Sequence, residues 1–173
     1  MKKVAVTYFE PFGGRTTNAS KEVVTALKDY ETYELPVSWN QVVLQLKAIF
    51  KQKPDCLFMV GEAGSYREIT IEKCAHNLAN GIDNDNIEKS NTAIIPFSFD
   101  CIETQFDLSS VPFCISENAG QYLCNYSYYN ALMLADNTKV IFIHLPYIEK
   151  EGPNSLVNLE KQLNQIIDIL TKE

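Results

Sequence analysis

The stretch Cys56-Leu57-Phe58-Met59-Val60 is a continuous apolar run, and it decides the fold class. A short run without polar alternation is typical of a strand that is buried on both faces, as strands of parallel sheets are. The run follows Pro54 and an amphipathic pattern that predicts a helix from Trp39 to about Lys51. A helix that leads into a doubly buried strand is the unit from which α/β proteins are built.

The same alternation of strand and helix patterns continues on both sides of this unit. It predicts an α/β sandwich with a largely parallel sheet, and the absence of repeats and linkers predicts a single domain over residues 1–173. Residues 81–91 are rich in Asn and Asp and are predicted to be a loop. The predicted strands are 3–9, 33–37, 69–72, 111–115 and 139–145, and the other predicted helices are 18–29, 119–135 and one that runs from about Gly152 through Leu170.

The charge balance excludes some classes of partner. The 173 residues include 15 Lys and Arg against 22 Asp and Glu, which gives a net charge of −7. We therefore expect neither nucleic-acid nor anionic-membrane binding. No apolar run is long enough for a membrane span, and the short apolar run after Lys2 and Lys3 ends at Glu10, unlike a signal peptide. We expect a cytoplasmic protein.

The cysteines and histidines do not have the spacing of a disulfide framework or a zinc site. The cysteine count is odd, no CxxC spacing occurs, and the only histidines are His76 and His144. Glu72 and His76 have the i, i+4 spacing of a metal pair but lack a third ligand. We expect no metal, no cofactor, and mostly buried, unreactive thiols. The five cysteines are Cys56, Cys74, Cys101, Cys114 and Cys124.

Cys124 is the cysteine whose context favours reactivity. A predicted strand precedes it, and a predicted helix contains or follows it. The positive end of a helix dipole favours a thiolate, and the N–H groups there can bind an oxyanion. The alternative is a buried cysteine on a helix, which is the common case for an arbitrary cysteine.

His144 and Glu72 are candidate partners for that thiol. His144 lies near the end of an apolar strand, where α/β proteins expose functional side chains, although it could also close a sheet edge with one hydrogen bond. Glu72 ends the extended segment 69–72, and a carboxylate against an imidazole fixes its tautomer. The alternative for Glu72 is a solvated charge or an ion pair with Lys73.

The segment from Tyr8 to Gly14 joins a predicted strand to a predicted helix. It lacks the glycine spacing of a dinucleotide loop, and no GK[ST] follows, so phosphate binding is not indicated. Phe9 and Phe12 instead indicate a flat apolar slot, unless both rings belong to the core.

These segments, taken in chain order, resemble the type I pyroglutamyl peptidases, also called pyrrolidone-carboxylate peptidases. The resemblance spans nearly the whole chain, and its cysteine and glutamate motifs are long enough to be specific. The matching residues are 9–14 with Asn18 and Ser20 for the family's FxPFGG…NPS signature, 61–64, 69–73 and 75–77 for the glutamate motif, 116–125 for the cysteine motif, 142–146 for the histidine segment, and 35–37 for a smaller match.

The resemblance implies a three-layer α/β/α sandwich and a cysteine exopeptidase that removes an N-terminal pyroglutamyl residue from peptides. By matching positions, Cys124 is the nucleophile, His144 the base and then the acid, and Glu72 the residue that orients His144. Family members need no metal or coenzyme, and bacterial members are usually homotetramers. A slot between Phe9 and Phe12 suits the flat lactam, and Asn18 orders the N-terminal loop or helps to read the ring.

The chain departs from the family pattern at two places near the site. Glu62 stands where members often carry Gln, and a carboxylate only accepts hydrogen bonds, so Glu62 could alter lactam recognition or be protonated. Residues 80–86 lack the Arg that helps to form the family's oxyanion hole. Two alternatives follow from these departures: a related cysteine hydrolase of altered specificity, and a non-catalytic ligand-binding relative.

Overall fold

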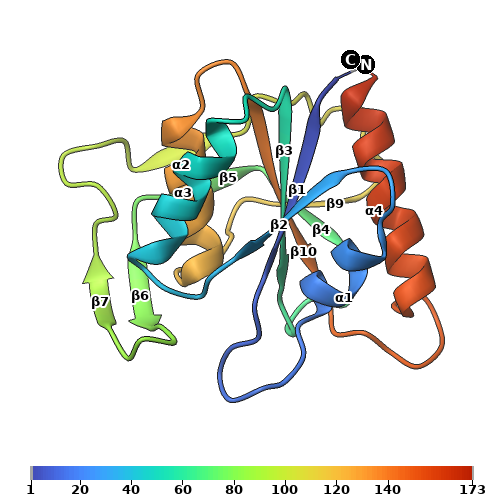
Figure 1. Cartoon of the computed structure of the whole chain (residues 1–173), viewed down its shortest axis with the longest axis horizontal. Helices are drawn as coiled ribbons and strands as arrows, with labels where there is room; N and C mark the ends of the chain where they lie inside the picture. The colour runs from blue at the N-terminus through green and yellow to red at the C-terminus, as the bar shows by residue number, and fades with distance from the viewer. Residues whose placement is uncertain (1, 173) are drawn as a thin grey trace.

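The centre of the molecule is a six-stranded sheet, seen in a computed structural model that describes residues 2–172 (Figure 1). Its first four strands are mutually parallel, the fifth is antiparallel to the fourth, and the sixth is parallel to the fifth. The predicted, largely parallel sheet is therefore confirmed. In spatial order the strands are β2 (Glu31–Leu35), β1 (Val4–Phe9), β3 (Cys56–Glu62), β10 (Lys139–Leu145), β4 (Thr70–Glu72) and β9 (Cys114–Ser116).

Four helices cover the two faces of the sheet and complete the three predicted layers (Figure 1). Helices α1 (Ala19–Ala26) and α4 (Leu156–Thr171) cover one face, and α2 (Gln41–Phe50) and α3 (Leu123–Leu134) cover the other. Every residue of β3 is buried, which explains why its sequence does not alternate. Leu57 and Met59 pack toward α2 and α3, whereas Phe58 and Val60 pack toward α1 and α4.

The helix after β9 starts later than the sequence pattern predicts. The pattern predicts a helix from residue 119, but α3 begins at Leu123, after Gly120 adopts a φ of +83°. A glycine in this left-handed region interrupts the helical path, and its N–H bonds to Asn118 Oδ1 instead. This shorter helix places Cys124 in the first turn.

The prediction of a loop over residues 81–91 is wrong in part. The segment carries a hairpin of β6 (Ala79–Ile82) and β7 (Glu88–Thr92), turned by Asp83, whose Oδ1 accepts the N–H groups of Asp85 and Ile87. The polar, exposed β7 gives no apolar alternation from which a strand could be predicted. A second small sheet pairs β5 (Cys74–His76) with β8 (Cys101–Glu103).

Other boundaries shift by a few residues: α1 ends at Ala26, α2 begins at Gln41, and β2 begins at Glu31. Within the range 2–172, no helix combines the length and apolarity that a membrane crossing needs.

We expect the Phe58→Ala substitution to lower the free energy of unfolding by about 3–5 kcal/mol, because it leaves a cavity in a fully buried strand. Phe58 is 0% exposed and packs against Phe106 at a ring-centroid distance of 5.6 Å. Urea denaturation of both proteins measures the difference. Phe99→Ala, at a side chain that is 71% exposed, is the matched control and should cost less than 1 kcal/mol. Equal losses in the two variants would contradict this placement of the core.

Candidate active site

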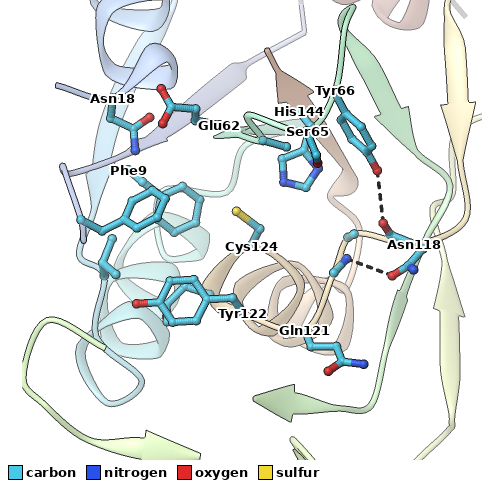
Figure 2. A pocket seen from close by; sticks show the side chains of 16 residues that line it. Phe9, Asn18, Glu62, Ser65, Tyr66, Asn118, Gln121, Tyr122, Cys124 and His144 are labelled. Atoms are coloured by element: carbon cyan, nitrogen blue, oxygen red, sulfur yellow. Dashed lines mark hydrogen bonds between the residues drawn. The ribbon is translucent and has the colours of Figure 1, made fainter. Parts of the chain in front are cut away.

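A pocket of about 390 Å³ lies at the carboxyl ends of β1, β3 and β10 (Figure 2). Phe9, Glu62 and His144 reach it from these three strands, and Cys124 reaches it from the first turn of α3. Carboxyl ends of parallel strands are the usual place for sites in open α/β sheets. The pocket thus gathers residues that are far apart in the sequence.

Cys124 lies in the first turn of α3, where the backbone N–H groups have no acceptor within the helix. The first N–H groups of α3 have no acceptor inside their own helix, and the dipole of the helix makes this end positive. In Figure 2 the thiol points into the pocket, next to the ring of His144. This position offers N–H donors to an anion formed beside the thiol.

Gly61 makes room for the thiol. A Cβ atom at this position would lie 2.9 Å from Cys124 Sγ and 2.7 Å from the ring of Phe142. The Phe142 ring is fully buried and the Cys124 side chain is short, so a larger residue at this position would displace the ring or the thiol. Glycine is required here by close approach rather than by backbone conformation.

His144 and Glu72 form a buried hydrogen-bonded pair. His144 Nδ1 lies 2.7 Å from Glu72 Oε1, and the two residues are 4% and 0% exposed. They belong to the antiparallel strands β10 and β4, in which His144 pairs with Thr70 and Glu72 pairs with Phe142. Diagonal neighbours of this kind lie on one face of a sheet, here the face that α3 covers. Since Nδ1 is bonded to Glu72, Nε2 is the ring nitrogen that can exchange protons with groups in the pocket.

The pair is electrostatically suited to hold a proton on His144. Burial lowers the pKa of His144, but the charge of Cys124 and the hydrogen bonds with Cys124 and Glu72 outweigh burial and raise it to about 9. Burial raises the pKa of Glu72, but its hydrogen bonds, led by that with His144, leave it below the usual value. At neutral pH the site therefore favours an imidazolium beside a carboxylate.

Tyr66 is a site residue that the sequence reasoning missed. Its hydroxyl lies 3.0 Å from Glu72 Oε1, and its ring packs edge-on against His144 at 5.6 Å. The same hydroxyl lies 3.3 Å from the carbonyl oxygen of Asn118, across the pocket mouth (Figure 2). Tyr66 lies in the loop after β3. Its position just beyond the carboxyl end of a strand is the only feature of the sequence that could have indicated a role in the site.

Asn125 fixes the start of α3 against the neighbouring small sheet. It is fully buried, its Oδ1 accepts the N–H of His76, and its Nδ2 donates to the carbonyl oxygens of His76 and Leu78. These three bonds lie one residue from Cys124. The amide side chain thereby holds the backbone next to Cys124 in place.

The segment without the family arginine packs directly on the pocket wall. Gly81 lies so close to Tyr122 that a Cβ atom would be 2.7 Å from its ring, and the Tyr122 hydroxyl donates to the Ile82 carbonyl oxygen at 2.7 Å. Asp83 Oδ2 accepts the N–H of Trp39, which holds the segment against α2. Residues 80–86 therefore support Tyr122 and supply no cation.

Phe9 and Phe12 both line the pocket, as the slot hypothesis requires. Phe9 is 2% exposed and also packs against Phe142, with ring centroids 6.3 Å apart. Phe12 packs against Tyr122 at 6.0 Å. Each ring thus contributes both to the pocket and to the hydrophobic core, so the slot and the core interpretations of Phe9 and Phe12 both hold.

Asn18 lines the pocket but is engaged with the backbone. It is the N-cap of α1, and its Oδ1 accepts the N–H of Ser20 at 2.9 Å and the Ser20 hydroxyl at 2.7 Å. Its Nδ2 donates to the carbonyl oxygen of Glu10 at 3.3 Å. These contacts order the loop between β1 and α1.

Glu62 is buried beside Asn18, with partners on both carboxylate oxygens. Arg15 Nη1 donates to Oε1, and the N–H of Ala19, at the start of α1, donates to Oε2 at 2.7 Å. The Arg15 guanidinium also stacks on the ring of Tyr147 at 4.6 Å. Arg15, from the loop between β1 and α1, therefore balances the charge of the Glu62 carboxylate in the pocket wall.

Comparisons with known proteins agree with this arrangement. The family model described as pyroglutamyl peptidase matches residues 2–162. The chain is 30% identical to the human pyroglutamyl-peptidase 1 over 188 residues, covering 96% of this chain and 88% of that protein. It is 31% identical to the pyrrolidone-carboxylate peptidase of Thermosipho africanus, covering 97% of this chain and 93% of that protein.

Solved structures show the same fold. The pyrrolidone carboxyl peptidase of Thermococcus litoralis superposes with a TM-score of 0.88 at 26% identity and covers 99% of this chain and 94% of that one. The corresponding enzyme of Fervidobacterium islandicum AW-1 gives a TM-score of 0.87 at 30% identity, with 98% of both chains covered.

We expect the stability conferred by His144 to depend on pH. The pKa of His144 is raised from 6.5 to about 9 in the folded state, so its stabilisation is complete below pH 6.5 and is lost as pH rises through 9. The full difference corresponds to about 3 kcal/mol, at about 1.36 kcal/mol per pH unit. Urea denaturation of the wild type and His144→Asn across this range should show the gap between them shrinking. A gap that stays constant would refute the raised pKa.

Proposed function

Because the chain belongs to the pyroglutamyl peptidase family, we propose that it is a cysteine exopeptidase that removes an N-terminal pyroglutamyl residue from peptides. The observation that carries the proposal is the buried pair of His144 and Glu72, in which His144 lines the same pocket as Cys124. In this proposal Cys124 is the nucleophile, His144 the acid and base, and Glu72 the residue that orients His144.

The first half of the reaction forms an acyl-enzyme. The Cys124 thiolate attacks the carbonyl carbon that joins the pyroglutamyl residue to the next residue, and the carbonyl oxygen becomes an oxyanion. The C–N bond then breaks, and the His144 imidazolium protonates the leaving amine. A pKa of about 9 on His144 keeps that proton available at neutral pH.

The second half releases the product. Neutral His144 takes a proton from water, the resulting hydroxide attacks the thioester, and pyroglutamate leaves as the C–S bond breaks. The Cys124 thiolate and the His144 imidazolium are thereby restored. Glu72 holds Nδ1 throughout, so the same ring nitrogen, Nε2, faces the reacting atoms in both halves.

The first-turn N–H groups of α3 are the proposed oxyanion donors. They surround Cys124 and have no intrahelical acceptors, so they can stabilise the charge where it develops. Because residues 80–86 contribute no arginine, backbone donors carry a larger share of this role here.

The pocket suits a small, flat and uncharged lactam. Phe9 and Phe12 provide apolar walls, and the Glu62–Arg15 pair removes net charge from the polar end. Both oxygens of Glu62 are already bonded, which favours a role in shaping the pocket through Arg15 and α1. Asn18 would act in the same way, as the cap that sets the start of α1.

We also propose, from the family resemblance, that the chain acts in the cytoplasm and assembles as a homotetramer of single-domain subunits. Light scattering coupled to size-exclusion chromatography measures the assembly directly.

We expect the purified protein to hydrolyse a pyroglutamyl fluorogenic amide and to leave a prolyl amide intact, because only the pyroglutamyl ring is a lactam. Cys124→Ala should lower turnover by about 10⁴-fold or more, since it removes the nucleophile. Alkylation of the thiol should have the same effect on the wild-type protein.

Cys56→Ala is the matched control, because it makes the same change at the opposite end of β3 from Gly61 and Glu62. It should keep wild-type turnover. Full activity of Cys124→Ala would remove this residue from the mechanism, and cleavage of the prolyl amide would favour a hydrolase of different specificity.

We expect Glu62→Gln and Arg15→Ala each to raise KM about tenfold with little change in kcat, because each frees the loop that carries Phe12. The double variant should cost no more than either single variant, since both break the same contact. Steady-state kinetics of the four proteins completes this cycle. If the increases in KM multiply in the double variant, Glu62 contacts the lactam ring of the substrate independently of Arg15.

A further inference from the structure

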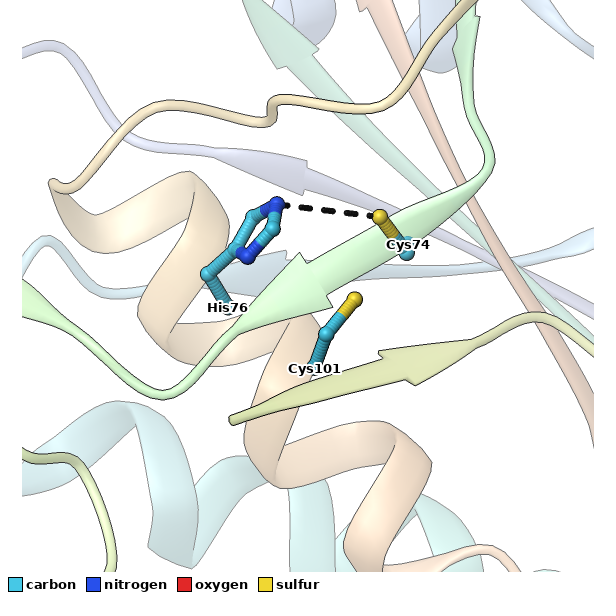
Figure 3. A group of neighbouring side chains, drawn as sticks. All are labelled: Cys74, His76 and Cys101. Atoms are coloured by element: carbon cyan, nitrogen blue, oxygen red, sulfur yellow. Dashed lines mark hydrogen bonds between the residues drawn. The ribbon is translucent and has the colours of Figure 1, made fainter. Parts of the chain in front are cut away.

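A second group of reactive side chains lies outside the pocket, on the small sheet of β5 and β8 (Figure 3). The ligand atoms of Cys74, His76 and Cys101 all lie within 4.8 Å of one another. Cys74 and His76 lie two residues apart on β5, and Cys101 is the direct cross-strand partner of His76 on β8. The mechanism proposed above uses none of these three residues.

We propose that Cys74, His76 and Cys101 bind one soft divalent metal ion of the Zn²⁺ class, and that its binding releases the loop of residues 117–121. Two thiolates and an imidazole are a donor set that such ions prefer. The proposal corrects the expectation from sequence, which found no ligand spacing because Cys101 is 25 residues from His76 and only sheet pairing brings it close.

The distances are close to those that a tetrahedral site needs. Zn–S bonds of about 2.3 Å and Zn–N bonds of about 2.0 Å place two ligand atoms about 3.5–3.8 Å apart. Cys74 Sγ and His76 Nε2 are 3.8 Å apart in the structure. Since all three ligand atoms lie within 4.8 Å of one another, Cys101 Sγ is at most about 1 Å beyond this separation, and water would take the fourth position.

The free protein uses two of these ligand atoms to hold the backbone of Glu117. His76 Nε2 lies 2.8 Å from the Glu117 carbonyl oxygen, and the Cys74 thiol donates to the same oxygen at 3.3 Å.

Metal binding is incompatible with both of these hydrogen bonds. Each thiol loses its proton to solvent when it binds the ion, and the imidazole changes tautomer so that its proton sits on Nδ1 and the Nε2 lone pair is free to bind the metal. Neither Cys74 nor His76 can then donate to Glu117. The Glu117 carbonyl oxygen then loses its two donors. Glu117 is exposed, so water can replace these donors, and the loop then loses two of the hydrogen bonds that hold it against β5.

The loop connects the cluster to the catalytic pocket. Asn118, Gly120 and Gln121 line that pocket, and they also line a neighbouring hollow together with His76. The loop ends at Tyr122, whose ring packs edge-on against Trp39 at 5.4 Å. Trp39 is the single tryptophan of the chain, so its fluorescence reports on this end of the loop.

The test is a titration with Cd²⁺, a thiol-preferring probe, in the Cys124→Ala protein with a non-thiol reductant present. This background removes the catalytic thiol, which with His144 would otherwise offer a second thiolate and imidazole. The ultraviolet absorption of the Cd²⁺–thiolate bond measures binding, and Trp39 fluorescence measures the loop. Neither readout depends on peptidase activity, so failure here is distinct from failure of the proposed function.

We expect one Cd²⁺ per chain and a fluorescence change that saturates with it. Adding Cys101→Ser should weaken binding at least about 100-fold, since it removes one of three protein ligands, and His76→Gln should do the same while still being able to donate to Glu117. Adding Cys114→Ser, which removes an exposed thiol outside the cluster, should leave affinity unchanged. Circular dichroism confirms that each variant folds.

Two results would overturn the proposal. One is the absence of a thiolate absorption band, or equal affinity with and without Cys101, either of which would exclude the metal site. The other is stoichiometric binding without any change in Trp39 fluorescence or in the hydrogen exchange of residues 117–121, which would refute the link to the loop.

Discussion

The hydrogen bond of 2.7 Å between His144 Nδ1 and Glu72 Oε1 is the interaction on which the arrangement of the site depends. It joins diagonal neighbours on two antiparallel strands, so the pairing of β10 with β4 sets its geometry. A slip of one residue in that register would turn one side chain to the opposite face of the sheet. The only antiparallel pairing in the six-stranded sheet therefore has a direct chemical consequence.

Because both residues are buried, the hydrogen bond between His144 and Glu72 also determines how their charges are stabilised. Both side chains are almost inaccessible to water, and a lone buried charge in either position would be unfavourable. Together with Cys124 they compensate one another, which is why the pKa of His144 rises despite its burial. Tyr66 adds a hydroxyl to the same carboxylate oxygen and packs on the imidazole, so it restricts the movement of both groups.

The thiol reaches this pair because two constraints meet at the start of α3. Gly61, the residue that pairs with His144 across β3 and β10, leaves the space that Cys124 Sγ occupies. Asn125 ties the first turn of α3 to the backbone of His76, in β5, and of Leu78. Since β5 also carries Cys74 and His76, this strand supports both the helix that carries Cys124 and the cluster that holds the Glu117 carbonyl oxygen.

Long, strongly patterned segments were predictable from the chain. The apolar runs of β3 and β10 and the helical periodicities predicted an α/β sandwich with a largely parallel sheet, because burial on both faces or on one stripe restricts residue type. The three-layer arrangement was implied by the family resemblance. The motifs around Cys124, His144 and Glu72 predicted the residues that we propose for the site. The hairpin of β6 and β7 could not be predicted, because its exposed strands carry polar residues that are equally common in loops.

The amino-acid sequence by itself thus determined the α/β fold class, since this depends on local pattern, and its motifs indicated the family and the residues that we propose for the site. Only the tertiary structure decided which partners those residues have. The ion pair of Glu62 with Arg15, the contact of Tyr66 with Glu72, and the grouping of Cys74, His76 and Cys101 all depend on side-chain positions between segments that are distant or irregular in sequence. Such distances follow from strand register and loop path, which no periodicity of the chain encodes.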